Sequence, residues 1–589
     1  MPTNVAVVRL AVVLVVLGTF NLIAQESKDS AGQGKPAPGS QQSSSAVPSQ
    51  SLPHREKASQ AAPPLPGPSL KVTSRMVLVD AVVTDKAGKP VSGLKASDFE
   101  ILENGKPQAI RAFGAREPAS KEALPPASKV LPSGLFTNIP DFRPEDGPPT
   151  VVLIDALNTS IQDQPYMRNQ LVKYLKGVGS RHNVAVYILS SRLRLLQDFT
   201  SDPQVLQSVV AKMELHSSLL TDTSEGEMGA LSDNVAGAIQ DFNAEQEAFK
   251  MDMRVRITMD ALKLISRNVS GYPGRKNLIW LSGSFPLYIA PDTDLSNPFL
   301  SQRQYADQIH DAANILTDSQ IAVYPVDARG LVGNLMPDAS SHGFTSGRQT
   351  MKRISDASAN LQGSHDAMNS LADQTGGRAF YNRNDIDQAI NLSVEDGSTY
   401  YSFGYYPDDK NWNGKFRKIE VKILNKDLRI RHRRGYFAVD TSASVDTGTK
   451  EARSEFGSAL ALESPMVTML PFAAQVSMPT ATEPDVIVNF GVDPRAISFD
   501  LQADHLRHAK VDFVILAFDG KGKVVASKTD TLTASLRPDT FDAVMTSHLP
   551  FEQHVNLAPG KYRLRIGVRD QRNNLIGTVL ADVEVPPKN

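Results

Sequence analysis

Oxygen-bearing side chains that could hold a metal ion follow a short apolar run near residue 150. Residues 151–154 read Val-Val-Leu-Ile, and Asp155, Asn158, Thr159 and Ser160 follow them. An apolar run of this length is typical of a strand buried on both faces of a parallel sheet. Ligands bind such sheets at the carboxyl ends of the strands, and clustered oxygen ligands there suit a divalent cation such as Mg²⁺. The pattern therefore predicts a cation site or partner-binding site at this position.

Strands and helices alternate through the region that would position these side chains. Alternation of this kind predicts a parallel sheet. The expected strands cover residues 151–154, 184–189, 277–281 and 321–326, and the expected helices cover residues 164–178, 203–213, 231–269 and 305–318. Asp327 follows the last of these strands, so we expect it at the same edge as Asp155. Residues 400–439 alternate as antiparallel strands do, and we expect them to extend one edge of this sheet.

The N-terminal region predicts export. Residues 1–24 have the pattern of a signal peptide, with an apolar core too short to span a bilayer and a cleavage position after Ala24. An uncleaved signal anchor is the alternative, and it is the one expected route of membrane attachment. Residues 25–69 are rich in Ser, Gln, Ala, Pro and Gly, which predicts a disordered linker.

The rest of the chain is expected to fold as several domains, because 589 residues exceed what one core supports. Residues 70–115 read as a small β module with a hairpin at Asn104-Gly105. The further expected divisions are a Pro-rich linker at 116–149, a central domain at 150–440, a linker at 441–465 and a C-terminal β-sandwich at 466–589.

Composition excludes several classes of function. The formal net charge of −2 gives no electrostatic reason to expect nucleic acid as a partner. The chain contains no cysteine, which excludes disulfides, thiolate metal sites and cysteine nucleophiles.

Short motifs in a fixed order resemble the von Willebrand factor A (VWFA)-related proteins of the type found in Acidobacteria. The motifs are Leu-Ile-Asp-Ala-Leu-Asn-Thr at 153–159, Leu-Gln-Asp-Phe-Thr-Ser-Asp at 196–202, Gly-Arg-Lys-Asn-Leu-Ile-Trp-Leu-Ser-Gly at 274–283, Val-Tyr-Pro-Val-Asp-Ala-Arg-Gly at 323–330 and Arg-Arg-Gly-Tyr-Phe at 433–437. The stretch at 98–106 also fits. The resemblance implies an α/β fold: a Rossmann-like, doubly wound, mostly parallel sheet flanked by small N- and C-terminal β-sandwich domains.

The resemblance also implies a metal-ion-dependent adhesion site, which this sequence matches in part. Asp155 fits the first ligand position and Thr159 the second hydroxyl position, but Leu157 stands where a serine is expected and offers no oxygen. The alternative interpretation is that Asp155, Asn158 and Thr159 cap the following helix and bond loop amides.

The two remaining ligand positions are weaker. A threonine is expected from the following loop, where Thr221 or Thr223 could supply it, and Ser282-Gly283 replaces the aspartate of a Thr-Asp-Gly turn. The expected site is therefore degenerate, with Mg²⁺ or Mn²⁺ bound weakly or not at all. Its expected metal residues are Asp155, Thr159, Thr223 and Ser282, and its expected partner-binding residues are Asp155, Asn158, Thr159 and Asp327.

These features favour a non-enzymatic adhesion or scaffolding protein that is periplasmic, on the cell surface or secreted and binds an unidentified protein. In the family that the chain resembles, the cation bridges to a carboxylate of the partner. The standard peptidase, hydrolase-elbow, phosphate-loop and dinucleotide motifs are absent from the sequence. The alternatives are a cell-envelope hydrolase, for which His342, His365 and Asp366 are the candidate catalytic residues, and a purely structural spacer.

A basic cluster lies near the end of the central region. Arg429, Arg431, His432, Arg433 and Arg434 could bind an anionic partner or membrane surface. They could also be the charges of an edge strand that prevent sheet-to-sheet aggregation.

Overall fold

The computed structural model divides the chain into two units, Met1–Thr73 and Ser74–Asn589. It describes residues 76–116, 131–140, 147–177, 183–214, 220, 233–283, 285, 288–289, 297, 299–331, 347–438, 449–480 and 485–587. The signal peptide and disordered linker expected at 1–24 and 25–69 lie outside these residues. None of the described helices is long and apolar enough to cross a membrane.

A five-stranded sheet carries the residues that sequence analysis singled out. Its order is β12-β9-β6-β7-β8, with parallel pairing from β12 to β7 and with β8 antiparallel to β7. The strands are β6 (Thr150–Asp155), β7 (Val184–Leu189), β8 (Leu193–Thr200), β9 (Lys276–Ser282) and β12 (Ile321–Asp327).

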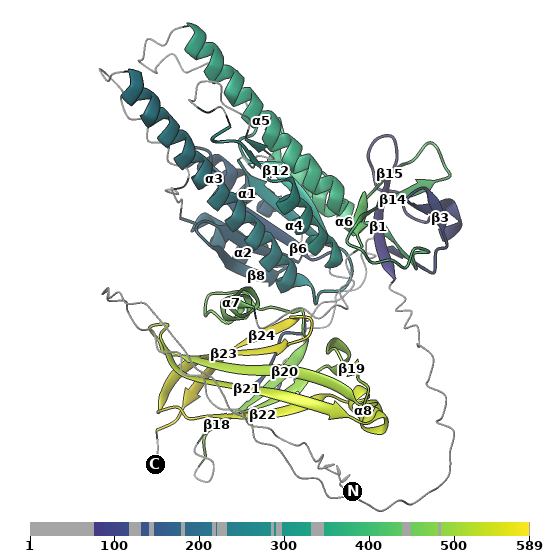
Figure 1. Ribbon diagram of the computed structural model, residues 1–589, viewed down its shortest axis with the longest axis vertical. Coiled ribbons are helices and arrows are strands. Elements are labelled where there is room, and N and C mark those ends of the chain that lie inside the picture. Colours follow the sequence, from purple (N-terminus) through teal and green to yellow (C-terminus); the bar gives the residue numbers. More distant parts are fainter. Residues whose placement is uncertain are drawn as a thin grey trace, which may run out of the picture. The chain divides into compact units, whose positions relative to one another are not determined.

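Helices cover both faces of this sheet (Figure 1). Alternate side chains of a strand point to opposite faces. Val152 and Ile154 of β6 therefore share a core with α1, α2 and α6, whereas Val151 and Leu153 share a core with α3, α4 and α5. The helices are α1 (Gln164–Gly177), α2 (Pro203–Ala211), α3 (Asp233–Val269), α4 (Ala306–Asp318), α5 (Gly347–Thr375) and α6 (Ile386–Ser398). Burial on both sides explains why residues 151–154 are uniformly apolar.

The expected fold class, a Rossmann-like, doubly wound, mostly parallel sheet with small flanking sandwiches, is wrong for this chain. Among the described strands, parallel pairing joins only β12 to β9, β9 to β6 and β6 to β7. The other sheets are antiparallel, so the described chain is mostly antiparallel and sandwich-like. The expectation failed because the alternating strands and helices of residues 150–330 and the family resemblance were extended to segments whose strands pair antiparallel in other sheets.

Two antiparallel sheets combine segments that lie about 300 residues apart. One has the order β15-β1-β13-β4 and the other β16-β14-β2-β3. Their strands are β1 (Val77–Thr84), β2 (Phe99–Glu103), β3 (Lys106–Gln108), β4 (Ala112–Arg116), β13 (Tyr400–Tyr405), β14 (Phe416–Ile423), β15 (Arg429–His432) and β16 (Gly435–Phe437). A common apolar core lies between them, which we call the split core. The expectation that residues 400–439 extend the β6 sheet is therefore wrong.

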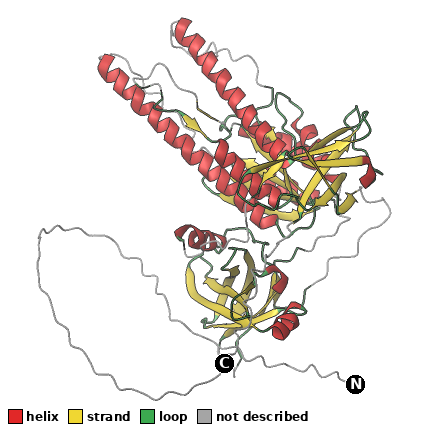
Figure 2. Ribbon diagram, turned by 45° about the vertical axis from the view of Figure 1, so that its right-hand side comes forward, coloured by secondary structure: helices red, strands yellow, loops and turns green. Residues whose placement is uncertain are grey.

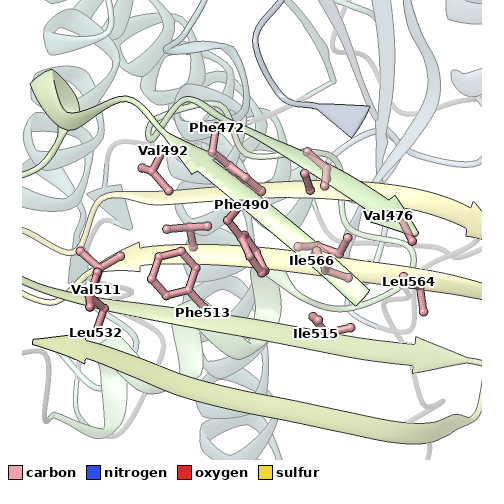
Figure 3. Packing of buried hydrophobic residues seen from close by; sticks show 14 of the residues in the cluster. Phe472, Val476, Phe490, Val492, Val511, Phe513, Ile515, Leu532, Leu564 and Ile566 are labelled. Atoms are coloured by element: carbon pink, nitrogen blue, oxygen red, sulfur yellow. The ribbon is translucent and has the colours of Figure 1, made fainter. Parts of the chain in front are cut away.

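The C-terminal residues also form two antiparallel sheets over one core. The orders are β22-β18-β17-β5 and β19-β20-β23-β24, with β21 paired to β20. The strands are β5 (Leu135–Thr137), β17 (Phe472–Ser477), β18 (Val486–Val492), β19 (Asp500–Leu501), β20 (Arg507–Phe518), β21 (Val524–Leu536), β22 (Leu549–Val555), β23 (Gly560–Asp570) and β24 (Ile576–Val585). Figure 3 shows Phe490 and Phe513 meeting in this core, with ring centroids 4.9 Å apart.

Several smaller elements lie outside these cores or in segments expected as linkers, and two short 3-10 helices are Ala96–Asp98 and Pro494–Ala496. Strand β5 comes from the segment expected as a Pro-rich linker, and helix α7 (Lys450–Ala459) lies within the linker expected at 441–465. The others are the hairpin β10 (Tyr288–Ile289) with β11 (Arg303–Gln304), and helix α8 (Pro538–Met545).

Candidate functional site

Asp155 ends β6 and is completely buried. Its Oδ1 accepts the backbone N–H of Asn158 at 2.9 Å, and its Oδ2 accepts the Asn158 side-chain amide at 2.9 Å. The neighbouring strand β9 supplies two more donors to Oδ2, the Trp280 indole at 3.0 Å and the Ser282 hydroxyl at 2.9 Å. Ser282 is there because parallel pairing puts it in register with Asp155. Both carboxylate oxygens are therefore occupied by protein donors.

The charged side chain nearest to this carboxyl group in its hydrogen-bond network is an arginine. Burial raises the pKa of Asp155, and the hydrogen bonds from Asn158, Ser282 and Trp280 oppose that rise. Arg254 of α3 donates its Nε to Asn158 Oδ1 at 3.0 Å. Burial lowers the pKa of Arg254, and the negative charge of Asp155 opposes this. A guanidinium thus lies one side chain away from the carboxyl group.

Thr159 and Leu157 are also part of the packed structure. The Thr159 hydroxyl accepts the backbone N–H of Gly283 at 2.9 Å. A side chain at Gly283 would lie 3.1 Å from the Asn158 carbonyl oxygen and 3.1 Å from Thr159 Cα, so the loop after β9 approaches this closely because residue 283 is glycine. Leu157 is fully buried in the core beneath α3.

These residues do not fit a cation in the geometry that the structure describes. Mg²⁺ is usually held by one or two carboxylates together with water, and it needs free oxygen lone pairs. Here Asp155 and Thr159 already accept protein hydrogen bonds, and Arg254 brings a positive charge. Thr223, the expected loop ligand, lies outside the described residues, as does Thr221. Across the described ranges, no three His, Cys, Asp or Glu side chains are close enough to hold a metal ion.

Asp327 ends β12 at the same edge of the sheet but has its own partners. Arg329 donates Nε to Oδ1 at 2.9 Å and a terminal nitrogen to Oδ2 at 2.7 Å. His365 of α5 places Nε2 3.3 Å from Oδ2. Burial alone would raise the pKa of Asp327, but the hydrogen bonds from His365 and Arg329 hold it below its usual value. Strand β9 separates β6 from β12 in the sheet, so Asp155 and Asp327 form two networks rather than one site.

The candidate catalytic residues do not form a common centre among the described residues. His365 is buried, and its ring stacks on Tyr381 at a centroid distance of 4.1 Å. Asp366 accepts a hydrogen bond from Gln362 on the exposed side of α5. His342 lies outside the described residues.

Two helices extend past the edge of the sheet at which β6, β9 and β12 end, which we call the carboxyl edge. Arg254 fixes α3 at this edge, and His365 fixes α5 there. About 20 residues of each helix precede those points, which at 1.5 Å per residue is about 30 Å. We call these parts, residues 233–253 and 347–364, the helical arms; both are seen in Figures 1 and 2.

Large apolar side chains are exposed on the arms and on the loops at the carboxyl edge. Phe242 and Phe249 of α3 are 59% and 62% exposed, and Met351 of α5 is 68% exposed. The two phenylalanines are seven positions apart, about two helical turns, so they lie on one face of the helix. Ile161 follows β6 and Leu331 follows β12, and both are exposed as well.

Sequence analysis missed Arg254, Trp280 and the arm residues. Arg254 lies in a long polar helix without a distinguishing motif, and Trp280 lies in a uniformly apolar strand. The seven-residue spacing of Phe242 and Phe249 was the one feature of the sequence that could have indicated the exposed residues of the α3 arm.

Comparisons with known proteins do not assign the chain to a family. No protein-family model matches the chain, and no curated protein matches it. Among solved structures, it is similar to an aerotolerance-related membrane protein from Bacteroides fragilis (14% identity, 42% of this chain, 98% of that chain, TM-score 0.24). It is also similar to the conserved hypothetical protein BatB from Bacteroides thetaiotaomicron (12% identity, 42% of this chain, 97% of that chain, TM-score 0.23). A third similar structure is the PilB minor pilin from Streptococcus sanguinis (9% identity, 42% of this chain, 60% of that chain, TM-score 0.23). TM-scores of this size do not establish a shared fold.

Proposed function

We propose that the chain is an exported, non-catalytic protein that binds a protein partner through the carboxyl edge and the helical arms. The observation that carries the proposal is the exposure of Phe242, Phe249 and Met351 on helices that extend beyond the core. Exposed apolar side chains that gather on one part of a surface mark interaction sites, and aromatic residues and Met are enriched in interfaces.

The loops of the carboxyl edge add to this surface. Ile161 and Leu331 are exposed there, whereas the polar residues Asp155, Asn158 and Asp327 are buried in hydrogen-bond networks. We therefore propose that these three residues hold the loops in shape and that the apolar side chains make the contacts. Binding is then independent of a bound metal ion.

The motif resemblance to VWFA-related proteins supports the same class of function, since that family binds partners at this position. The signal-peptide pattern of residues 1–24 supports export to the periplasm, the cell surface or the medium. The tight packing of His365 between Asp327 and Tyr381 favours a structural role for this histidine over a catalytic one.

The test is site-specific photo-cross-linking in the organism that produces the protein. A photoreactive amino acid replaces Leu331 or Phe249, and the matched control carries it at Phe416, which is also partly exposed but lies on β14. We expect a discrete covalent adduct from positions 331 and 249 and none from position 416.

A double variant tests whether the α3 arm contributes to the partner contact detected at position 331. Phe242→Ser combined with Phe249→Ser should reduce the adduct formed at position 331 about tenfold, because aromatic anchors carry much of the energy of an interface. Equal adducts from all three positions, or none from 249 and 331, would overturn the proposal.

A further inference from the structure

A basic hollow of about 470 Å³ lies between the end of β1, the edge strand β15 and the segment that follows α5. It is lined by Thr84, Lys86, Ala87, Gly88, Arg378, Arg429, Ile430 and Arg431. This volume falls in the usual range for small-molecule sites, about 300–1,000 Å³.

Four of the lining residues are cationic, and their positive charge exceeds the nearby negative charge. Lys86 pairs with Asp427 at 2.6 Å, but both side chains are largely exposed, so the pair is weak. Arg431 pairs with Asp396 at 2.7 Å. Asp396 also acts electrostatically on Arg378, so this one carboxylate is shared by two arginines of the hollow.

The backbone fixes the three arginines firmly. Arg429 and Arg431 alternate along β15, so their side chains share one face, and β15 pairs with β1 from Thr84 to Val82. Arg378 follows Gly376-Gly377, where a Cβ on Gly377 would lie 1.9 Å from the Val323 carbonyl oxygen. The turn can approach β12 this closely only with glycine, and it sets the position of Arg378.

Packing orients Arg378 as well. Its guanidinium carbon lies 5.1 Å from the centroid of the Phe380 ring. Burial lowers the pKa of Arg378, and the positive charges of Arg431 and Arg383 lower it further, whereas the negative charge of Asp396 opposes this. The like charges of the hollow therefore repel one another, and a bound anion would relieve that repulsion.

Protection of an edge strand does not account for this arrangement. β15 is an edge strand, and exposed charges on it would be enough to discourage pairing with another sheet. That role does not require Arg378, which comes from a separate segment, or a concave shape. Planar guanidinium groups that converge on a hollow are the usual means of binding oxyanions.

We propose that the basic hollow binds a soluble ligand that carries at least two phosphate-type negative charges. Arg378 and Arg429 are its main contacts, and Lys86 and Arg431 add to the positive field. The concave shape favours a free ligand over the flat surface of an anionic membrane. This site is independent of the partner-binding surface on the arms.

Calorimetric titration of the full chain with inorganic pyrophosphate tests the proposal. We expect a Kd below about 1 mM at about 20 mM salt, weakening as salt is raised. Arg378→Gln and Arg429→Gln should each weaken binding about tenfold, since each removes charge-assisted hydrogen bonds. The matched control is Arg563→Gln, an exposed arginine on β23, which should bind as the wild type does.

Other results would overturn the proposal. Both arginines are exposed, so the variants should melt at the wild-type temperature, which separates lost binding from lost folding. Absence of binding by the wild type, an equal loss in the Arg563→Gln control, or full binding by both hollow variants would each refute the site. Association with phosphatidylglycerol vesicles without any response to pyrophosphate would assign the arginines to a membrane surface instead.

Discussion

At the scale of single residues, the carboxyl edge contains two buried aspartates that the protein treats differently. Asp155 is surrounded by uncharged donors, and its pKa is raised, chiefly by burial. Asp327 forms a two-point contact with Arg329 and lies beside His365, and its pKa is lowered despite burial. Both were predicted from the sequence as site residues at strand ends. Asn158 and Ser282 were also singled out from the sequence, but the contacts of Arg254 with Asn158 and of His365 with Asp327 were not, because both residues come from other helices.

Asp155→Ala should destabilise the protein strongly, whether or not Mg²⁺ is present. The substitution leaves the buried Trp280 N–H, Ser282 O–H and Asn158 amide without their acceptor, which costs on the order of 3 kcal/mol. Urea unfolding monitored by tryptophan fluorescence in a Trp412→Phe background measures this at Trp280 alone.

Asp427→Ala is the control for that experiment. Asp427 also accepts a hydrogen bond, from Lys86, but both side chains are largely exposed, so its loss should cost less than about 0.5 kcal/mol. A ligand that binds only the folded state raises stability, so if about 10 mM Mg²⁺ stabilised the wild type but not Asp155→Ala, a working metal site would be indicated and the metal-free interpretation would be wrong.

The lowered pKa of Asp327 predicts how the stability of the protein changes with pH. A carboxyl group whose pKa is lowered on folding contributes stability above its unfolded value of 3.8, and that contribution is lost as the pH falls toward the folded value. Asp327→Asn should therefore be less stable than the wild type at pH 6, and the difference should shrink as the pH falls from about 5 to about 3. Urea unfolding of both proteins across that range measures it. A difference that stays constant with pH would mean that the charge of Asp327 contributes nothing.

At the scale of elements, many strands and helices were predicted correctly from local sequence patterns. The pairing of strands that lie far apart in the chain was not. The Asn104-Gly105 turn does join β2 to β3, and the helix expected at 231–269 is α3, Asp233–Val269. An alternating pattern shows that a strand is half-buried, but it does not identify the neighbouring strand. Strand β13 therefore read correctly as antiparallel but was assigned to the wrong sheet, because its partner β1 lies about 320 residues earlier.

The length of α3 was also predictable from the sequence, but its extension past the sheet as a helical arm was not. The base of the α3 arm is held by Asp252, which accepts hydrogen bonds from Arg303 at 2.9 Å and from Tyr305 at 3.0 Å. The sequence that precedes Asp252 does not mark the point at which the helix leaves the sheet. The contacts of Asp252 with Arg303 and Tyr305 and of Arg254 with Asn158 set where the arm begins.

At the scale of the whole molecule, the split core is the feature that most constrains how the chain can be divided. Strands β1, β2 and β4 lie before residue 117, and strands β13 to β16 lie after residue 399, yet they bury one set of apolar side chains. Cutting the chain at residue 438 leaves the split core intact. It does remove β17, the partner strand of β5, together with the Arg267–Glu455 ion pair and the hydrogen bonds that Thr468 makes with Asn268 and Gly271.

This organisation predicts opposite behaviour for two fragments. Residues 150–440, the central domain as the sequence suggested it, keep β13 to β16 but lose every partner strand from residues 77–116. The lost strands cover Phe403 and Ile419 in the native chain, so the fragment exposes a buried core and should aggregate or unfold. Residues 76–438 retain the split core and should be soluble, with a cooperative melting transition. Size-exclusion chromatography and calorimetry of the two fragments measure the difference. A monomeric 150–440 fragment that melts like 76–438 would show that residues 400–437 fold without β1, β2 and β4, and the two segments would then be independent modules rather than one sandwich.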